Sequence, residues 1–230
     1  MNKGKFVVID GTDGSGKGTQ LNLLSKKLRH LKIPFKTIDF PRYSDNAYGK
    51  LAGRYLKGEF GGIKFVSPYL ASLAFAGDRL LAKPLIDEWL NKGFLVISNR
   101  YASSNKAHMS ANIEPGKRKE FMDWLDNLEY KTNKLPRPDL TIFLYVTPEI
   151  GQQNVDSKKI REYLEDEKRD ILEKDLKHLQ DSSEVYLYLS KTEPNWKVIN
   201  CMSEGKMRSR EEIHKEILKV LNKDKILKNG

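Results

Sequence analysis

Short apolar segments recur along the chain, and longer stretches with helical spacing of leucines separate them. Five such segments stand out, at residues 5–10, 35–40, 94–98, 140–146 and 196–200. Each has the length of a buried strand. Strands that alternate with helices predict an α/β fold with a mainly parallel, five-stranded sheet and helices on both of its faces.

A leucine stripe and a helix-start signal predict the first two long helices. The stripe that follows the first strand consists of Leu21, Leu24, Leu28 and Leu31. Ser67 is an N-cap and Pro68 a favoured first residue for a second, longer helix. That helix runs towards Trp89 and stops at Gly93, and Pro84 is expected to kink or divide it.

Three later stretches also have helical features. Residues 118–130 form a polar, helix-like stretch, and Ser209 with Glu212 forms a capping box for the last helix. The apolar positions of the last two helices are Leu172, Leu176, Leu179 and Tyr186, followed by Ile213, Ile217 and Leu221. This spacing predicts helices with one buried face.

The stretch 151–168 differs from the rest because it has almost no apolar residues and no periodic stripe. Such a segment buries little surface, so we expect it to move. It is either a lid over an active site, covering about residues 151–169, or a plain surface loop. We see no interdomain linker and expect residues 1–230 to form a single domain.

Composition excludes several classes of protein. The chain has 230 residues, of which 39% are hydrophobic, a net charge of +10 and one cysteine, Cys201. An internal disulfide is therefore excluded, and no Cys/His cluster suggests a metal cage. Without a membrane-length apolar run or a signal-peptide core, we expect no membrane partner and a cytoplasmic location. Lysines alternate with acidic residues, which favours a solvated surface over a nucleic-acid-binding one.

A glycine-rich turn joins the first strand to the first helix. Its spacing, Gly11-x-x-x-x-Gly16-Lys17, fits a P-loop, in which backbone N–H groups, a helix N-terminus and a lysine face one phosphate group. Gly18 stands where Ser or Thr is expected, and Thr19 follows as the candidate Mg²⁺ ligand. The residues expected to bind the phosphates of a nucleotide are Gly11, Gly14, Ser15, Gly16, Lys17, Gly18 and Thr19.

Two arginines come directly after strands that end beside this loop. Arg42 follows the second strand and Arg100 the third. Ligands bind beyond the carboxyl ends of such strands, so these arginines suggest a second phosphate opposite the first. The stretch Asn133-Lys-Leu-Pro136 lacks the aspartate of a guanine-reading motif, which discounts a GTPase. Phe75 and Arg79 lie one helical turn apart, an arrangement that suits a nucleobase, although Phe75 alone is typical of a core.

These residues resemble the thymidylate kinase family over nearly the whole chain. The matching motifs are Gly11-Thr-Asp-Gly-Ser-Gly-Lys17, Phe40-Pro-Arg42, Phe75-Ala-Gly-Asp-Arg79 and Asn99-Arg-Tyr-Ala-Ser-Ser-Asn105-Lys-Ala-His108. The resemblance implies a P-loop NTPase three-layer sandwich. It also implies a homodimer that uses Mg²⁺ and transfers the γ-phosphoryl group of ATP to dTMP.

The resemblance also implies roles for the acceptor-site residues. Phe75 would stack on thymine and Arg79 would reach its O4. Ser104 and Asn105 would line the base near N3 and the phosphate region. The remaining substrate residues are Arg42 and Arg100 on the acceptor phosphate, Asp13 near the sugar and phosphate, and His108 beside the sugar 2′ carbon.

The same resemblance implies the catalytic set. Asp13, Lys17 and Arg100 belong to it. Gly14 stands where some relatives have an arginine, which moves the catalytic arginine to the lid. The lid candidates are Arg161 and Arg169, with Lys158, Lys159 and Lys168 nearby.

Asn99 departs from the family, which usually has an aspartate before this arginine. Together with Gly18 it suggests a lower Mg²⁺ affinity. Three alternatives stay open at this point: a kinase for another nucleotide or a deoxynucleoside, a non-catalytic nucleotide switch, and a nucleic-acid-binding module.

Overall fold

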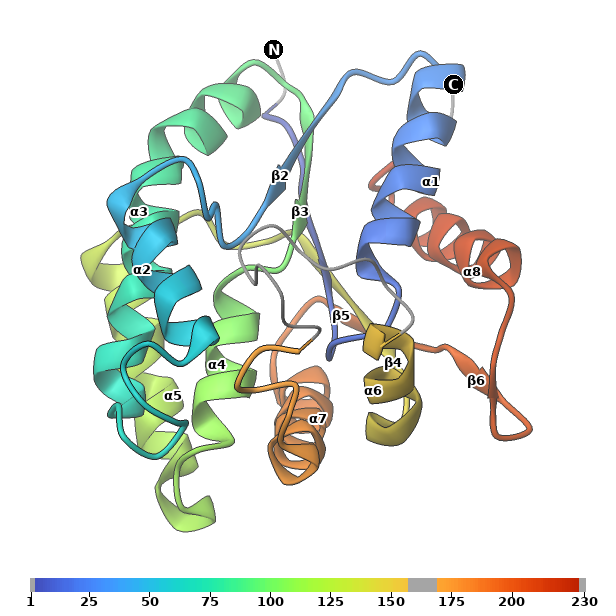
Figure 1. Ribbon diagram of the computed structural model, residues 1–230. Helices are drawn as coiled ribbons and strands as arrows, with labels where there is room; N and C mark the ends of the chain where they lie inside the picture. The colour runs from blue at the N-terminus through green and yellow to red at the C-terminus, as the bar shows by residue number, and fades with distance from the viewer. Residues whose placement is uncertain (1–2, 157–168, 228–230) are drawn as a thin grey trace.

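The computed structural model describes residues 3–156 and 169–227 and contains the expected parallel sheet (Figure 1). The strands are β1 (Phe6–Asp10), β2 (Phe35–Asp39), β3 (Leu95–Asn99), β4 (Leu140–Tyr145) and β5 (Trp196–Asn200). They lie in the order β2-β3-β1-β4-β5, and every neighbouring pair is parallel. The sequence prediction of five strands is confirmed.

Alternate side chains of β1 enter two separate cores, as the pleat of a strand requires. Val7 and Ile9 pack with buried residues of two helices on one face of the sheet. Phe6 and Val8 pack with helices on the other face. The first face is covered by α1 (Lys17–His30) and α8 (Arg210–Lys223), and the second by α3 (Pro68–Asn91) and α4 (Ala102–Ser110) (Figure 1). The result is the predicted three-layer sandwich.

Four further helices lie within the described residues. They are α2 (Ala47–Lys57), α5 (Arg118–Asp126), α6 (Pro148–Asp156) and α7 (Leu176–Thr192). A 3₁₀ turn at Pro115–Lys117 precedes α5, and a π-helical turn at Asn127–Thr132 follows it. A short hairpin pairs β6 (Met202–Ser203) with β7 (Lys206–Met207). None of the helices in the described ranges is both long enough and apolar enough to cross a membrane.

The helix predictions hold with local differences. Pro84 does not divide α3, because buried Ala82 and Ile86 anchor the helix to the sheet on both sides of it. The stretch expected to be polar buries Phe121 and Leu125 completely. The capping box of Ser209 is present, and α8 buries its three expected apolar residues.

The start of the expected lid is helical rather than irregular. Residues 151–156 belong to α6, whose Gly151 is buried against the P-loop. Helix α7 begins at Leu176, where Asp175 caps it, so Leu172 lies before the helix instead of inside it. Residues 157–168, which hold most of the expected lid, lie outside the described residues, and the lid stays a prediction.

Candidate active site

The carboxyl ends of β1, β2 and β3 open into a cleft of about 1070 Å³. Most of the residues that the sequence singled out line it together. These are Asp13, Gly16, Lys17, Gly18, Arg42, Phe75, Arg79, Arg100, Ser104, Asn105 and His108. Gly11, Gly14 and Ser15 build the loop itself, whereas Thr19 and Arg169 are not among the lining residues.

The glycine-rich turn has the backbone that an anion-binding loop needs. Gly14 has a φ of 76°, and a Cβ there would lie 1.9 Å from the carbonyl oxygen of Gly151 in α6. Only glycine allows both this dihedral angle and this close approach. The hydroxyls of Thr12 and Ser15 are buried and have no hydrogen-bond partner among the described residues. The loop therefore presents polar groups that a phosphate would satisfy.

Lys17 folds back over the same loop. Its Nζ donates to the carbonyl oxygens of Gly11, at 2.9 Å, and Thr12, at 2.8 Å. The helix behind it begins at Lys17, so its positive end points in the same direction. At Gly18 a Cβ would meet nothing within 4 Å, so a side chain is sterically possible where the P-loop pattern has a hydroxyl.

Arg42 is held by one buried carboxylate. Its Nε donates to Oδ1 of Asp78 at 2.9 Å, and its backbone N–H donates to Oδ2 at 2.8 Å. Asn46 donates to the same Oδ1 at 2.6 Å. Asp78 thereby fixes one side of the guanidinium, and Nη1 on the other side lies 3.9 Å from a carboxylate oxygen of Asp45, which also lines the cleft.

Arg100 sits on the turn after β3, where its φ is 64°, and its side chain lines the cleft. Its Nη2 donates to Asp13 of the P-loop, and its Nη1 donates to Ser104 Oγ at 3.3 Å and to His108 Nε2 at 3.1 Å. Burial alone would lower the pKa of Arg100, but Asp13 and other negative groups raise it well above the usual value. The arginine therefore keeps its charge beside the P-loop.

Ser104 belongs to a buried network below this arginine. Its hydroxyl donates to Oδ1 of Asp10 at 2.7 Å and contacts the hydroxyl of Tyr186 at 3.0 Å. Ser103 donates to the other oxygen of Asp10, at 2.5 Å. Asp10 is the last residue of β1, so the network ties α4 and α7 to the start of the P-loop.

Phe75 and Arg79 share one side of the cleft. Arg79 is only 2% exposed and forms a two-point ion pair with Glu129, whose oxygens accept from its Nε at 3.1 Å and from its Nη2. Burial would lower the pKa of Arg79, but Glu129 more than offsets it. Asn105 lies beside this pair, and its Oδ1 is buried with no partner among the described residues. The wall therefore offers a ring, a fixed cation and a polar amide.

Asp39 and Asn99 end neighbouring strands and touch. The amide of Asn99 donates to both carboxylate oxygens of Asp39 at 2.9 Å. Asp39 lines the cleft, where partial burial of its carboxylate raises the pKa, while Asn99, Arg100 and Lys17 oppose that rise. Asp39 thus places a carboxylate directly beside Asn99.

The lid arginines are only partly placed. Arg161 lies outside the described residues. Arg169 pairs with Asp156 at the end of α6, with its Nε 2.7 Å from Oδ1 and its Nη2 2.5 Å from Oδ2. In this structure Arg169 does not contribute to the cleft.

Sequence reasoning missed the partners that hold the site. Asp78 is inside a quoted motif, and Asp39 ends a predicted strand, so both had a local signal. Glu129, Tyr186 and His178 come from helices far away in the sequence, and nothing in their spacing points to the cleft. Among the described residues, no group of three or more His, Cys, Asp or Glu side chains is placed to hold a metal ion.

Comparison with known proteins agrees with this geometry. The family model for thymidylate kinase matches residues 9–217. A thymidylate kinase of Mycobacterium tuberculosis is 30% identical over 186 residues, which is 80% of this chain and 85% of that protein. The thymidylate kinase of Plasmodium falciparum is 29% identical over 225 residues, which is 97% of this chain and 92% of that one.

The fold has a solved counterpart. A structure of the thymidylate kinase of Candida albicans matches with a TM-score of 0.73 and 25% identity, covering 97% of this chain and 93% of that chain. The residues matched by the family model include the P-loop, the two arginines and the Phe75–Arg79 wall. The chain therefore belongs to the thymidylate kinase family, the members of which are ATP-dependent phosphotransferases.

Proposed function

We propose that the chain transfers the γ-phosphoryl group of ATP to dTMP, giving dTDP and ADP, inside the cleft described above. The observation that carries this proposal is the pairing of two phosphate-binding features. The P-loop with Lys17 lines the cleft, and so do Arg42 and Arg100. An enzyme that transfers a phosphoryl group from one phosphate to another needs both features.

On the donor side the P-loop amides and Lys17 would bind the β- and γ-phosphates. Lys17 now bonds to two loop carbonyls, so a phosphate would replace these acceptors with stronger, charged ones. The hydroxyls of Thr12 and Ser15 have no hydrogen-bond partner among the described residues, so a phosphate oxygen would supply one. Transfer then depends on alignment and charge, since the protein adds little covalent chemistry.

On the acceptor side Arg42 and Arg100 would hold the phosphate of dTMP. Each arginine is already oriented by a carboxylate, Asp78 or Asp13, so little side-chain freedom is lost on binding. A planar guanidinium can bind two phosphate oxygens at once. The acceptor oxygen is thereby brought into line with the γ-phosphorus.

The base would sit against the Phe75 wall. Phe75 supplies a ring for stacking, Arg79 a donor for O4 of thymine, and Asn105 a polar amide near N3. His108, next to Arg100, lies on the side where the sugar would enter. The ion pair of Arg79 with Glu129 keeps the guanidinium in one place, which favours a base with an oxygen at that point.

Mg²⁺ fits the cleft that Asp39 lines together with Lys17 and Gly18, because the charge of Lys17 acts on the Asp39 carboxylate. Magnesium prefers hard oxygen ligands and keeps several waters, so one carboxylate suffices beside the ATP phosphates. Asp39 offers that carboxylate, and Thr19 remains the hydroxyl predicted from the sequence. The metal would offset charge on the transferring group.

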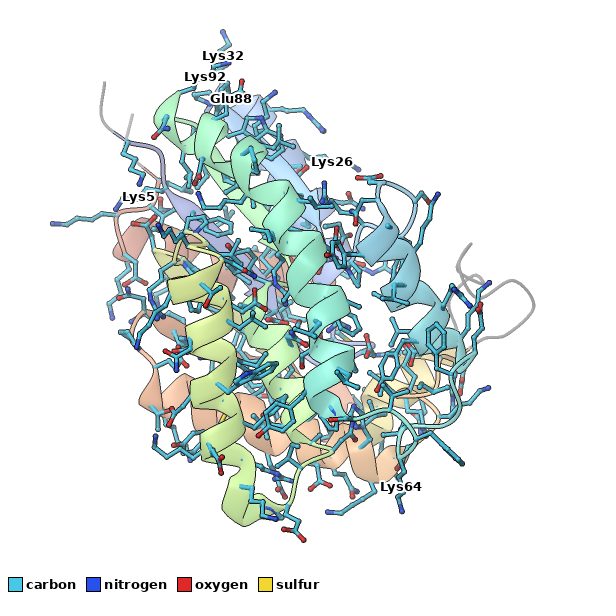
Figure 2. The ribbon with its side chains drawn as sticks, turned by 90° about the vertical axis from the view of Figure 1, so that its left-hand side faces the viewer. Lys5, Lys26, Lys32, Lys64, Glu88 and Lys92 are labelled. Carbon is cyan, nitrogen blue, oxygen red and sulfur yellow. The ribbon has the colours of Figure 1, made fainter. Side chains whose placement is uncertain are left out.

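A second copy of the chain is the proposed occupant of an apolar surface on α2 and α3. Figure 2 views this side of the molecule, with Lys64 near one end of α3 and Glu88 and Lys92 near the other. The exposed apolar residues of this surface are Tyr48, Leu51, Leu70, Leu73, Leu80 and Leu81. Exposed apolar patches of this kind mark interfaces. Light scattering after size-exclusion chromatography tests whether the chain forms this homodimer. The cytoplasmic location, a separate expectation from the sequence, stays a prediction.

The experiment that tests the activity is ADP release from ATP–Mg²⁺ with single acceptors. The panel contains dTMP, dUMP, dCMP, AMP, GMP and thymidine. We expect fast turnover with dTMP and slower turnover with dUMP, because one methyl group is worth about 1–3 kcal/mol. Thymidine should fail because it brings no phosphate to Arg42 and Arg100. Fast turnover with a different acceptor would contradict the proposal. ADP release that does not depend on any acceptor would contradict it as well.

A further inference from the structure

Two buried histidines continue the contacts of Arg100 into the protein. His108 on α4 accepts from Arg100 and lies 3.4 Å, Nδ1 to Nε2, from His178 in the first turn of α7. His178 Nδ1 in turn lies 3.0 Å from Oδ1 of Asn112. The ring centroids are 5.7 Å apart and the ring planes are inclined by 21°, which lets the two nitrogens face each other. Nothing in the phosphoryl transfer itself uses His178.

Arg100 decides where each proton lies. A guanidinium has donors only, so Nε2 of His108 must accept and its proton must sit on Nδ1. That N–H then donates to Nε2 of His178, whose own proton sits on Nδ1 and donates to Asn112. The opposite direction would place an N–H of His108 against an N–H of Arg100. Only one pair of tautomers therefore satisfies all three contacts.

The surroundings keep both rings neutral. Burial, and then the charge of Arg100, lower the pKa of His108 well below its usual value, with Lys17 and His178 acting the same way and Asp13 opposing them. Burial lowers the pKa of His178 to about 4, although Asp175, Asp13 and Asp181 oppose the shift. The ring of Tyr186 meets His108 edge-on at 5.8 Å and closes the other side.

We propose that His178 is a positioning residue for the acceptor arginine: it fixes the tautomer of His108, which accepts from Arg100 and holds its guanidinium across the cleft. The inference rests on the proposed function where it places the acceptor phosphate at Arg100. Asp13 holds Nη2, and His108 with Ser104 holds Nη1. The guanidinium thus has partners on both sides and meets the acceptor in one orientation.

Four variants test this role: His178→Leu, His178→Gln, His108→Leu and the double variant His108→Leu/His178→Leu. His178→Leu removes the acceptor for His108 and leaves an apolar side chain in the buried position. We expect the KM for dTMP to rise about tenfold, the effect of losing one hydrogen bond that helps to orient the charged Arg100. The KM for ATP should stay nearly unchanged. His178→Gln returns an acceptor oxygen and should recover most of the loss. His214→Leu, on the distant helix α8, is the matched control and should leave both values as they are.

Two results distinguish positioning from a structural role. If His178 acts through His108, adding His178→Leu to His108→Leu changes the KM for dTMP no further. Nitrogen-15 NMR of the imidazoles should show His108 protonated at Nδ1 in the unaltered protein and a mixture of tautomers in His178→Leu.

The proposal is overturned if the two substitutions add in full, or if His108 carries its proton on Nε2. It is also overturned if leucine and glutamine at position 178 behave alike. Absence of turnover with dTMP in the unaltered protein overturns the proposed function instead, and the NMR measurement still decides the tautomers.

Discussion

The donor and acceptor sides of the cleft are built in different ways. The donor side comes from residues 5–20, where one strand, one turn and one helix supply backbone groups and Lys17. The acceptor side collects side chains from β2, α3, β3 and α4, and each cation there has a carboxylate partner from another element. One side depends on backbone shape and the other on buried charge pairs.

This difference determines which substitutions impair each side of the cleft. A backbone site fails when a single methyl group changes its shape, even though no charge is lost. A side-chain site tolerates small changes in shape but fails when one member of a pair is removed, because the other is left buried and uncompensated. Substitutions on the two sides should therefore differ in kind as well as in size.

The largest effect is expected from Gly14→Ala on the donor side. The added Cβ would lie 1.9 Å from the carbonyl oxygen of Gly151, at a φ that disfavours side chains. The loop and α6 must separate, which misplaces the phosphate-binding amides. A misplacement of about 1 Å costs roughly 100-fold in rate, so kcat/KM for ATP should fall at least that far. Steady-state kinetics and binding of a non-hydrolysable ATP analogue measure it.

Gly116→Ala is the control for this substitution. A Cβ at Gly116 meets nothing within 4 Å, and its turn is far from the P-loop in sequence. Its kinetics should match those of the unaltered protein. Nucleotide binding by Gly14→Ala at full affinity would show that the close approach to Gly151 is not required.

The second effect is expected from Arg79→Ala on the acceptor side. It removes the donor proposed for O4 of thymine and leaves Glu129 buried without its cation. We expect kcat/KM for dTMP to fall by about 10- to 100-fold, with the KM for ATP unchanged. The free energy of unfolding should fall by about 3 kcal/mol, as for one broken buried ion pair. Kinetics and urea denaturation separate the two losses.

Arg29→Ala, on an exposed position of α1, is the control for loss of an arginine as such. It should leave the kinetics unchanged and lower the free energy of unfolding by no more than about 1 kcal/mol, the value of its exposed contact with the Phe35 ring. Equal changes in the KM for dTMP and for ATP in Arg79→Ala would remove this arginine from the base wall.

The contrast also explains what the sequence could predict. The strands, the P-loop and the arginines after strands have local signals, since apolar runs and glycine spacing lie within a few residues of each other. The partners of those arginines do not. Glu129 is 50 residues from Arg79 in the sequence, and His178 is 70 residues from His108. Only the packing of the helices shows that they are in contact. Asp39 ends a predicted strand, but its place beside Asn99 is known only because β2 and β3 are neighbours in the sheet.

The smallest effect concerns this last pair, where the two sides of the cleft meet. If Asp39 supplies the carboxylate for Mg²⁺, Asp39→Asn should weaken the metal by about 10-fold, the usual cost of altering a metal's surroundings. Asn99→Asp should strengthen it by adding a second carboxylate. The exchange Asp39→Asn/Asn99→Asp keeps one carboxylate and should return the affinity to near its original value. Electron paramagnetic resonance of Mn²⁺ with ADP bound measures the affinity without relying on turnover.

Asp87→Asn controls for the loss of one negative charge, because Asp87 pairs with Lys83 on α3 and does not line the cleft. It should leave the Mn²⁺ affinity unchanged. An unchanged affinity in Asp39→Asn, together with a loss in Thr19→Ala, would assign the metal to the hydroxyl of α1. The metal site would then be as local in sequence as the rest of the donor side. The opposite result makes the metal site depend on the pairing of β2 with β3, as the acceptor side depends on packing between distant elements.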